Sequence, residues 1–196
     1  MPVTHESLLN LESYARQRPA LRLGAISLRK QRQIRLDPAL MVQFENDETV
    51  RYQIQEVLRA ERLFEDHAVL QELQAYAPLM SDGHSWTATL FLEFPDPAQR
   101  RQMLERWAGI ERALYLRLGD SADRCLAITS TEPPGQPAAV HFLRFSPGPR
   151  LLDRLAAHAA PTLHLGCDHP YFSAETALPP PLVQLLKLDL NRFRSG

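Results

Sequence analysis

The hydrophobic pattern of the chain changes at Trp86, and this change constrains the fold more than any other feature. Before Trp86, apolar residues recur mainly at three- and four-residue steps, which is typical of amphipathic helices. After it, short runs of strand-forming residues alternate with two helical stretches. Strands are expected at 88–94, 114–118, 125–129, 140–145 and 162–167, and helices at 97–110 and 149–158. This order resembles a split βαβ, ferredoxin-like antiparallel sheet with an extra strand.

We therefore expect an α+β protein whose two regions form one compact structural unit. Residues 1–80 are expected to be mostly helical, with a short strand or hairpin between Ile34 and Phe44. Residues 86–196 are expected to form the ferredoxin-like region and to end in a C-terminal helix. The helical region would then pack on the sheet.

Prolines mark three of the expected boundaries. A short helix over 7–16 should end before Pro19, which opens a second helix, because proline disfavours helix interiors. The proline-rich stretch 132–137 should form a loop. The three prolines at 179–181 should start the final helix.

Composition and charge predict a soluble, cytoplasmic protein. With 22 basic and 23 acidic residues the formal net charge is −1, so no global field attracts nucleic acid or an anionic membrane. No apolar run approaches the roughly 18 residues of a membrane span, and the N-terminus has no signal-peptide pattern. Cys125 and Cys167 are too few for a disulfide scaffold and form no Cys-x-x-Cys pair, which favours a reducing compartment.

A basic cluster formed by Arg29, Lys30, Arg32 and Arg35 follows the apolar-periodic stretch 21–28. We expect it to be a solvated helix end, since cations stabilise the negative end of a helix dipole. Binding of an anion or a phosphate is the alternative.

Glu61 lies on the apolar face of the most strongly patterned helix. The apolar stripe of this helix consists of Val50, Ile54, Val57, Leu58 and Phe64. At about 100° per residue, Glu61 projects among these side chains, so its carboxylate is expected to face the core. A buried carboxylate must be paired, bound to a metal or protonated. A structural ion pair and a role in ligand or proton binding are both open.

His141 is a second polar residue in an apolar setting. On its strand it shares a face with Leu143 and Phe145, so it is expected to be buried. It is either a neutral, hydrogen-bonded core histidine or a metal-binding or catalytic residue. Arg144 points to the opposite face, where an ion pair with a carboxylate is expected.

The segment Asp168–His169–Pro170–Tyr171 follows a predicted strand. Pro170 restricts His169 to an extended conformation, so these side chains are held near the strand end. A structural turn capped by Asp168 and a functional site are both open. The spacing matches no metal-binding motif.

A polar row on the Glu61 helix includes Gln53, Glu56, Arg59 and Arg62. Such a row is commonly a solvated face held by local pairs. Alternatively, Gln53, Glu56 and Arg59 border a cleft between the two regions of the chain, where ligand sites tend to form.

Five motifs, spread over nearly the whole chain, are specific to one family. They are Phe44-Glu45-Asn46, Thr49-Val50-Arg51-Tyr52-Gln53-Ile54-Gln55-Glu56, Leu58-Arg59-Ala60-Glu61-Arg62, Ala139-Val140-His141-Phe142-Leu143-Arg144-Phe145 and Asp168-His169-Pro170-Tyr171. In these the chain resembles an uncharacterised bacterial family, a domain of unknown function of about this length. Val57 departs from the family pattern, which has methionine at this position. The resemblance implies that the gene lies near genes for rubrerythrin-like proteins and for iron-sulfur proteins related to heterodisulfide reductases. This neighbourhood implies an accessory role near redox metalloproteins.

Two functional hypotheses follow. The first is a non-enzymatic accessory protein that binds a redox partner, an iron-sulfur or rubrerythrin-like protein. The second is a small-molecule or metal-dependent enzyme in which Glu61, His141 and His169 converge on a cleft and serve as candidate metal ligands. No motif implies a cofactor or identifies catalytic residues. A nucleic-acid-binding module ranks third, because the chain is neutral and lacks the glycine-aromatic signature of such sheets.

Overall fold

The computed structural model describes residues 3–129, 138–157 and 161–190. The α-helices are α1 (Leu11–Gln31), α2 (Asp47–Glu61), α3 (Asp66–Tyr76), α4 (Pro97–Arg106), α5 (Pro149–Ala157) and α6 (Pro180–Asp189), and the 3₁₀ helices are η1 (His5–Ser7), η2 (Ala77–Leu79) and η3 (Ile110–Arg112). The strands are β1 (Gln33–Asp37), β2 (Leu40–Phe44), β3 (Trp86–Leu92), β4 (Leu114–Leu118), β5 (Arg124–Thr129), β6 (Val140–Phe145), β7 (Leu163–His169) and β8 (Phe172–Ala177). The predicted loop at 132–137 and the predicted helix end at 158 lie outside the described residues.

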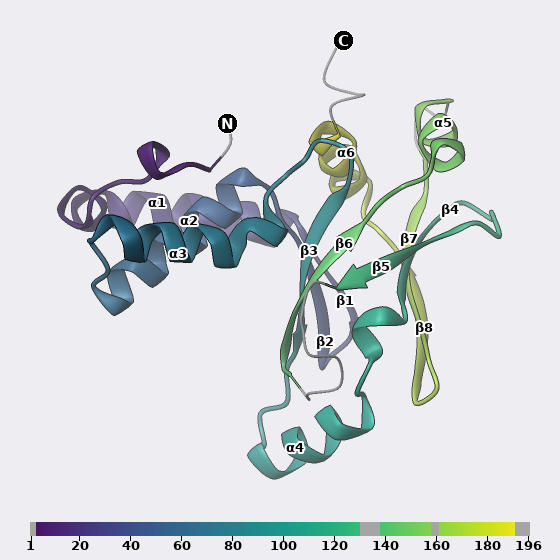
Figure 1. The fold of residues 1–196 in the computed structure, drawn as a ribbon. Coiled ribbons are helices and arrows are strands. Elements are labelled where there is room, and N and C mark those ends of the chain that lie inside the picture. Colours follow the sequence, from purple (N-terminus) through teal and green to yellow (C-terminus); the bar gives the residue numbers. More distant parts are fainter. Residues whose placement is uncertain (1–2, 130–137, 158–160, 191–196) are drawn as a thin grey trace.

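All eight strands belong to one sheet, in the order β1-β2-β3-β6-β5-β4-β7-β8. Every neighbouring pair is antiparallel. The two end strands, β1 and β8, approach each other, so the sheet curves into a nearly closed barrel (Figure 1). Closure of this kind leaves little unpaired strand edge.

The prediction of a ferredoxin-like, split βαβ sheet is wrong. In a βαβ unit the helix joins two strands that run in the same direction. Here α4 joins β3 to β4, which are separated by β6 and β5 in a sheet of antiparallel neighbours, so these two strands run in opposite directions. The same holds for β6 and β7, which α5 joins. The first region of the chain, moreover, supplies two strands of the sheet, β1 and β2.

Strand alternation gives the barrel an apolar inner face and a mixed outer face. Leu90 of β3 and His141 of β6 lie opposite each other on the inner face, whereas Thr89 and Phe142 lie opposite each other on the outer face. The interior core includes Phe44, Trp86, Leu90, Leu116, Phe145 and Leu165. A second core joins α2 and α3 to the outer face and includes Val50, Ile54, Leu58, Val69, Leu79 and the partly buried Phe142.

Helices α1, α2 and α3 form a layer beside β3 and β6, which we call the helical layer (Figure 1). The predicted break at Pro19 is wrong, because α1 runs through this residue. Proline removes the amide that would bond to the Ala15 carbonyl. Both residues are exposed, so water can bond to the freed carbonyl and the helix can continue.

Within the described part of the chain, no helix has both the length and the apolar character needed to cross a membrane.

Candidate functional site

A groove of about 510 Å³ separates the helical layer from the outer face of the sheet. We call it the interlayer groove. Its lining comes from α1, α2, α3, β3 and β6 and comprises Arg22, Ile26, Arg29, Tyr52, Gln53, Glu56, Val57, Tyr76, Thr89, Phe91, Val140 and Phe142. Ligand sites commonly have volumes of about 300–1,000 Å³ and lie between layers or domains. Of the three residues proposed to border a cleft, Gln53 and Glu56 line this groove, whereas Arg59 is not part of the lining and contacts Glu56 in an ion pair.

Strand register places the floor of the interlayer groove. Thr89 pairs with Phe142 across β3 and β6, and Phe91 pairs with Val140, so all four side chains point to the same outer face. Phe142 also contacts the Tyr76 ring of α3, with ring centroids 6.0 Å apart. This contact fixes one end of the helical layer against the sheet.

A buried hydrogen-bond network centred on Glu45 underlies the groove. The Glu45 side chain, only 3% exposed, follows directly after β2. Its carboxylate accepts hydrogen bonds from Gln43 (2.9 Å), Gln53 (3.1 Å), Thr89 (2.7 Å) and the Thr49 hydroxyl. All four of these donors are neutral, and Gln53 and Thr89 also line the interlayer groove.

Local sequence explains why Glu45 lies there. The Asn46 side chain caps α2 by accepting from the Thr49 amide at 2.9 Å, and the Thr49 hydroxyl in turn accepts from the Asn46 amide. This capping box fixes the first turn of the helix, and it places Glu45 directly before the helix N-terminus. The positive end of the helix dipole favours a carboxylate in that place.

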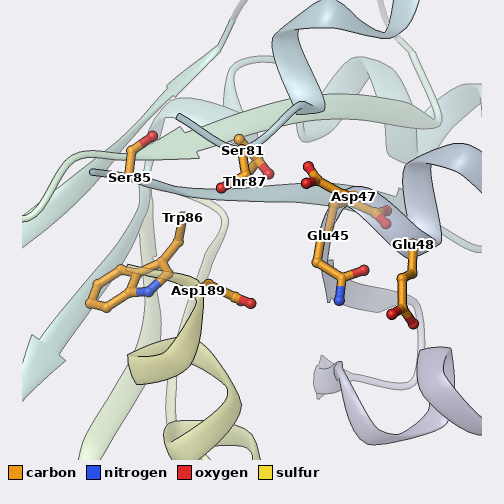
Figure 2. Close-up of a pocket in the computed structure, with 9 residues that line it drawn as sticks. Glu45, Asp47, Glu48, Ser81, Ser85, Trp86, Thr87 and Asp189 are labelled. Carbon is orange, nitrogen blue, oxygen red and sulfur yellow. The ribbon is translucent and has the colours of Figure 1, made fainter. Parts of the chain in front are cut away.

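A second, smaller hollow is lined in part by Glu45 and has a volume of about 150 Å³ (Figure 2). We call it the acidic pocket, since its lining includes Glu45, Asp47, Glu48 and Asp189. Figure 2 shows Asp189 of α6 beside Trp86, on the side of the pocket across from Glu48. Across the described residues, no three histidine, cysteine, aspartate or glutamate side chains are placed to hold a metal ion.

Glu56 joins α1 to α2 at one wall of the groove. Its carboxylate accepts two bonds from Arg18, both at 2.8 Å, and one from the hydroxyl of Tyr14 at 2.8 Å. The Arg18 guanidinium, assisted by Tyr14, lowers the pKa of Glu56 to about 2 against the cost of burial. Burial and the bond to Glu56 raise the pKa of Tyr14 well above its usual range. Glu56 is therefore ionised at neutral pH and links α2 to Tyr14 and Arg18 of α1.

Two arginines of α1, Arg22 and Arg29, face the groove and form no ion pair with a described residue. Arg29 donates through Nε to the Gln43 side chain at 2.8 Å. Among the residues that the structure describes, its two terminal nitrogens and the whole Arg22 guanidinium have no hydrogen-bond or ion-pair partner. These groups are available to a ligand.

Glu61 does not face a core, so the prediction of its burial is wrong. It is the last residue of α2, and its side chain is exposed. Arg62 adopts the left-handed conformation (φ 57°) and ends the helix, so the apolar stripe stops at Leu58 and Phe64 is 73% exposed. Arg62 is likewise exposed.

His141 is buried in the barrel, as predicted, at 7% exposure. Its Nε2 lies 2.8 Å from the Ala138 carbonyl oxygen, which satisfies the ring on that side. On the opposite face, the predicted ion pair of Arg144 is confirmed, because its guanidinium lies 2.6 Å from Asp82 and also bonds to Ser85 and to the Pro78 carbonyl.

Asp168, His169 and Tyr171 lie at the turn between β7 and β8. Asp168 pairs with Arg124 at 2.9 Å, the His169 ring lies 3.3 Å from the Ala108 carbonyl oxygen, and the exposed Tyr171 ring lies beneath Arg106. These contacts fit a structural turn, but the predicted cap by Asp168 is wrong: the Tyr171 amide donates to His169 Nδ1 at 3.3 Å, and the Asp168 carboxylate is bound by Arg124. The structure does not bring Glu61, His141 and His169 together, since they lie at a helix end, inside the barrel and at a hairpin turn.

The basic cluster is more embedded than a solvated helix end. Arg32 is 2% exposed and forms two bonds with Asp189 of α6, at 2.8 and 2.7 Å. Arg35 pairs with Glu93 at 2.6 Å.

Both cysteines are free and buried, and burial raises the pKa of each thiol to about 11.

Sequence reasoning missed Glu45, Gln43 and Thr89 as site residues. A signal was present, because alternation along β2 puts Gln43 on the face opposite to Val42 and Phe44. Glu45 continues this face beyond the strand, and Gln43 lies opposite Thr89 of β3, so polar side chains of two neighbouring segments gather on one surface.

Comparison with known proteins establishes the family. The family model described as "Protein of unknown function (DUF3501)" matches residues 2–190. A crystal structure of a novel protein of unknown function from Burkholderia pseudomallei K96243 is 36% identical, with a TM-score of 0.91 over 97% of this chain and 100% of that chain. A search of curated proteins found no match. The resemblance to an uncharacterised family is thereby confirmed, and the chain belongs to the DUF3501 family of proteins of unknown function.

Proposed function

We propose that this protein is a non-enzymatic accessory protein that binds a segment of a partner protein in the interlayer groove. The partner class is the one that the family resemblance implies, an iron-sulfur or rubrerythrin-like redox protein. The proposal rests on one observation. Exposed apolar side chains and arginine groups that have no hydrogen-bond or ion-pair partner among the described residues lie along one open groove.

The apolar part of the groove supports binding of a protein segment. Ile26 on α1 is 52% exposed and Val140 on β6 is 44% exposed, so the wall and the floor both offer apolar surface. Aromatic rings, which are enriched at binding hot spots, lie between them. Burial of these side chains by a partner would be favourable by about 25 cal/mol for each Å² removed from water.

The ionisable groups also favour binding over acid-base chemistry. Glu56, the carboxylate that lines the groove, is saturated by three hydrogen bonds and has a pKa of about 2. A general acid or base works best with a pKa near the operating pH. Glu56 is far from that condition.

The test is co-purification with purified rubrerythrin-like and iron-sulfur proteins from the same genome. Wild type should be retained by one of them, and Ile26→Asp, which places a charge on the groove wall, should lose retention. Leu70→Asp is the matched control, because Leu70 is a helical, 49% exposed leucine outside the groove. If wild type ignores both partner classes, or if Ile26→Asp binds as well as Leu70→Asp, the proposal is wrong.

A further inference from the structure

The α1 wall of the interlayer groove has a regular pattern of charge and apolar surface. Arg22, Ile26 and Arg29 occur at positions i, i+4 and i+7, so they share one face of the helix. Seven residues of helix span about 10 Å. The wall therefore presents two arginines whose Cα atoms lie about 10 Å apart along the helix, with an apolar side chain between them.

Two carboxylates, Glu56 and Glu45, lie near these cations, and among the described residues neither forms an ion pair with Arg22 or Arg29. Glu56 is neutralised by Arg18, which lies outside the groove lining. Glu45 lies beneath the floor, where neutral donors bind it, and Gln43 separates it from Arg29, so the two form no direct ion pair. Arg29 is held in place by its bond to Gln43, which leaves the end of its guanidinium free to take a carboxylate in a two-bond arrangement.

The remaining lining selects for apolar groups between the anions. Tyr52, Tyr76, Phe91 and Phe142 supply rings from three sides of the groove, and Val57 and Val140 supply aliphatic surface. The complementary ligand has two negative charges that flank an apolar side chain.

We propose that the interlayer groove binds an extended acidic segment of a protein, in which two carboxylates flank an apolar residue. This inference rests on the proposed function and adds the chemistry of the bound segment. In a polyproline II conformation, residues i and i+3 point to the same side about 9 Å apart, which matches the separation of the two arginines. The bound segment therefore has acidic residues at positions i and i+3, and at least one of the two residues between them is apolar.

The test uses a fluorescein-labelled peptide that contains Glu-Leu-Pro-Glu and a matched peptide that contains Gln-Leu-Pro-Gln. Anisotropy titrations should show that wild type binds the acidic peptide at least about tenfold more tightly than the amide peptide, with the difference shrinking as salt rises. Arg22→Glu should weaken binding of the acidic peptide about tenfold or more, since it replaces attraction by repulsion. Circular dichroism checks that this exposed helical substitution leaves the fold intact.

Arg101→Glu is the control, because Arg101 is an exposed residue of α4 outside the groove. This substitution changes the net charge by the same amount as Arg22→Glu. Equal affinity for the two peptides, or equal effects of Arg22→Glu and Arg101→Glu, would overturn the inference. Displacement of the acidic peptide by a short single-stranded RNA at lower concentration would overturn it in favour of a nucleic-acid ligand.

The outcomes separate this inference from the proposed function. If a redox partner binds wild type, fails to bind Ile26→Asp and still binds Arg22→Glu, the groove is the docking site but the acidic chemistry is wrong. If the acidic peptide binds through Arg22 and neither redox partner class is retained, the acidic chemistry holds and the assigned partner class is wrong.

Discussion

Glu45 is held in the protein interior by hydrogen bonds from neutral donors. Two amide groups and two hydroxyl groups point at its carboxylate, and the N-terminus of α2 lies directly after it. Burial of a carboxylate costs desolvation free energy, which these hydrogen bonds offset, and the cost rises when one of them is lost. The four donors belong to β2, α2 and β3, so one side chain ties three elements together.

Glu45→Gln should reduce the free energy of unfolding by about 1–3 kcal/mol, because one acceptor oxygen becomes a donor that faces other donors. Glu61→Gln, the same change at the exposed end of α2, should alter it by less than about 0.5 kcal/mol. Urea denaturation of both variants checks this pair of values. A larger loss of unfolding free energy for Glu61→Gln than for Glu45→Gln would contradict the assignment of Glu45 as the buried carboxylate.

Glu56 provides a pH-dependent contribution to stability. Its carboxyl is more acidic in the folded protein, with a pKa of about 2 against an ordinary value of 4.5, so the stabilisation is present above pH 4.5 and is lost as pH falls toward 2. Glu56→Gln should therefore destabilise by about 1–2 kcal/mol at pH 7, a figure reduced for solvent screening. Denaturation series from pH 7 down to the lowest pH at which both proteins fold should show the gap closing. A gap of constant size would contradict the assigned pKa.

The two glutamates show where residue-scale prediction succeeds and fails. Periodicity placed Glu61 on the apolar stripe, but neither glycine nor proline marks the end of α2, which comes at a left-handed arginine. Helix periodicity places Gln53 and Glu56 on one side of α2, and both line the interlayer groove, whereas Arg59 lies outside its lining. Glu45 was missed because its burial depends on helices that cover the outer face of the sheet, which is a tertiary property.

At the scale of elements, local pattern located strands but not their partners. The predicted strands at 114–118 and 140–145 coincide with β4 and β6. The strand order depends on pairings between distant residues, such as β6 inserted between β3 and β5, and no local pattern encodes that order. The continuity of α1 through Pro19 depends on solvent access to one carbonyl, which is also invisible to a propensity argument.

Gly166 in β7 tests how tightly one strand pair is packed. A Cβ at this position would collide with the ring of Tyr115 in β4, and that ring is held by Arg124, 4.0 Å from its centroid, and by Glu175 at 3.1 Å. Gly166→Ala should therefore lower the free energy of unfolding by about 1–3 kcal/mol.

Gly24→Ala is the matched control, because Gly24 lies inside α1 with open space around it. This variant should gain about 0.5–1 kcal/mol from helix propensity. Chemical denaturation measures both. Equal stability of Gly166→Ala and wild type would mean that Tyr115 moves aside freely.

At the scale of the whole molecule, the two regions of the sequence share one sheet. β1 and β2 come from the first region and pair with β3 of the second, and Arg32 at the end of α1 is tied to Asp189 of α6. We propose on this basis that the chain unfolds as one unit. Unfolding followed by circular dichroism reports mainly on the helices, whereas fluorescence reports on Trp86 and Trp107 in the barrel core. The two transitions should coincide, and separate midpoints would indicate two independent domains.

The central claim is that the interlayer groove is the binding surface of the molecule. Hydrogen-deuterium exchange of the wild-type protein, with and without the purified redox partner that it retains, tests this claim most directly. Binding in the groove should slow exchange in α1 between Arg22 and Arg29 and in β6 from Val140 to Phe142. Protection confined to α4 or to the turn between β7 and β8, with none along the groove, would contradict it.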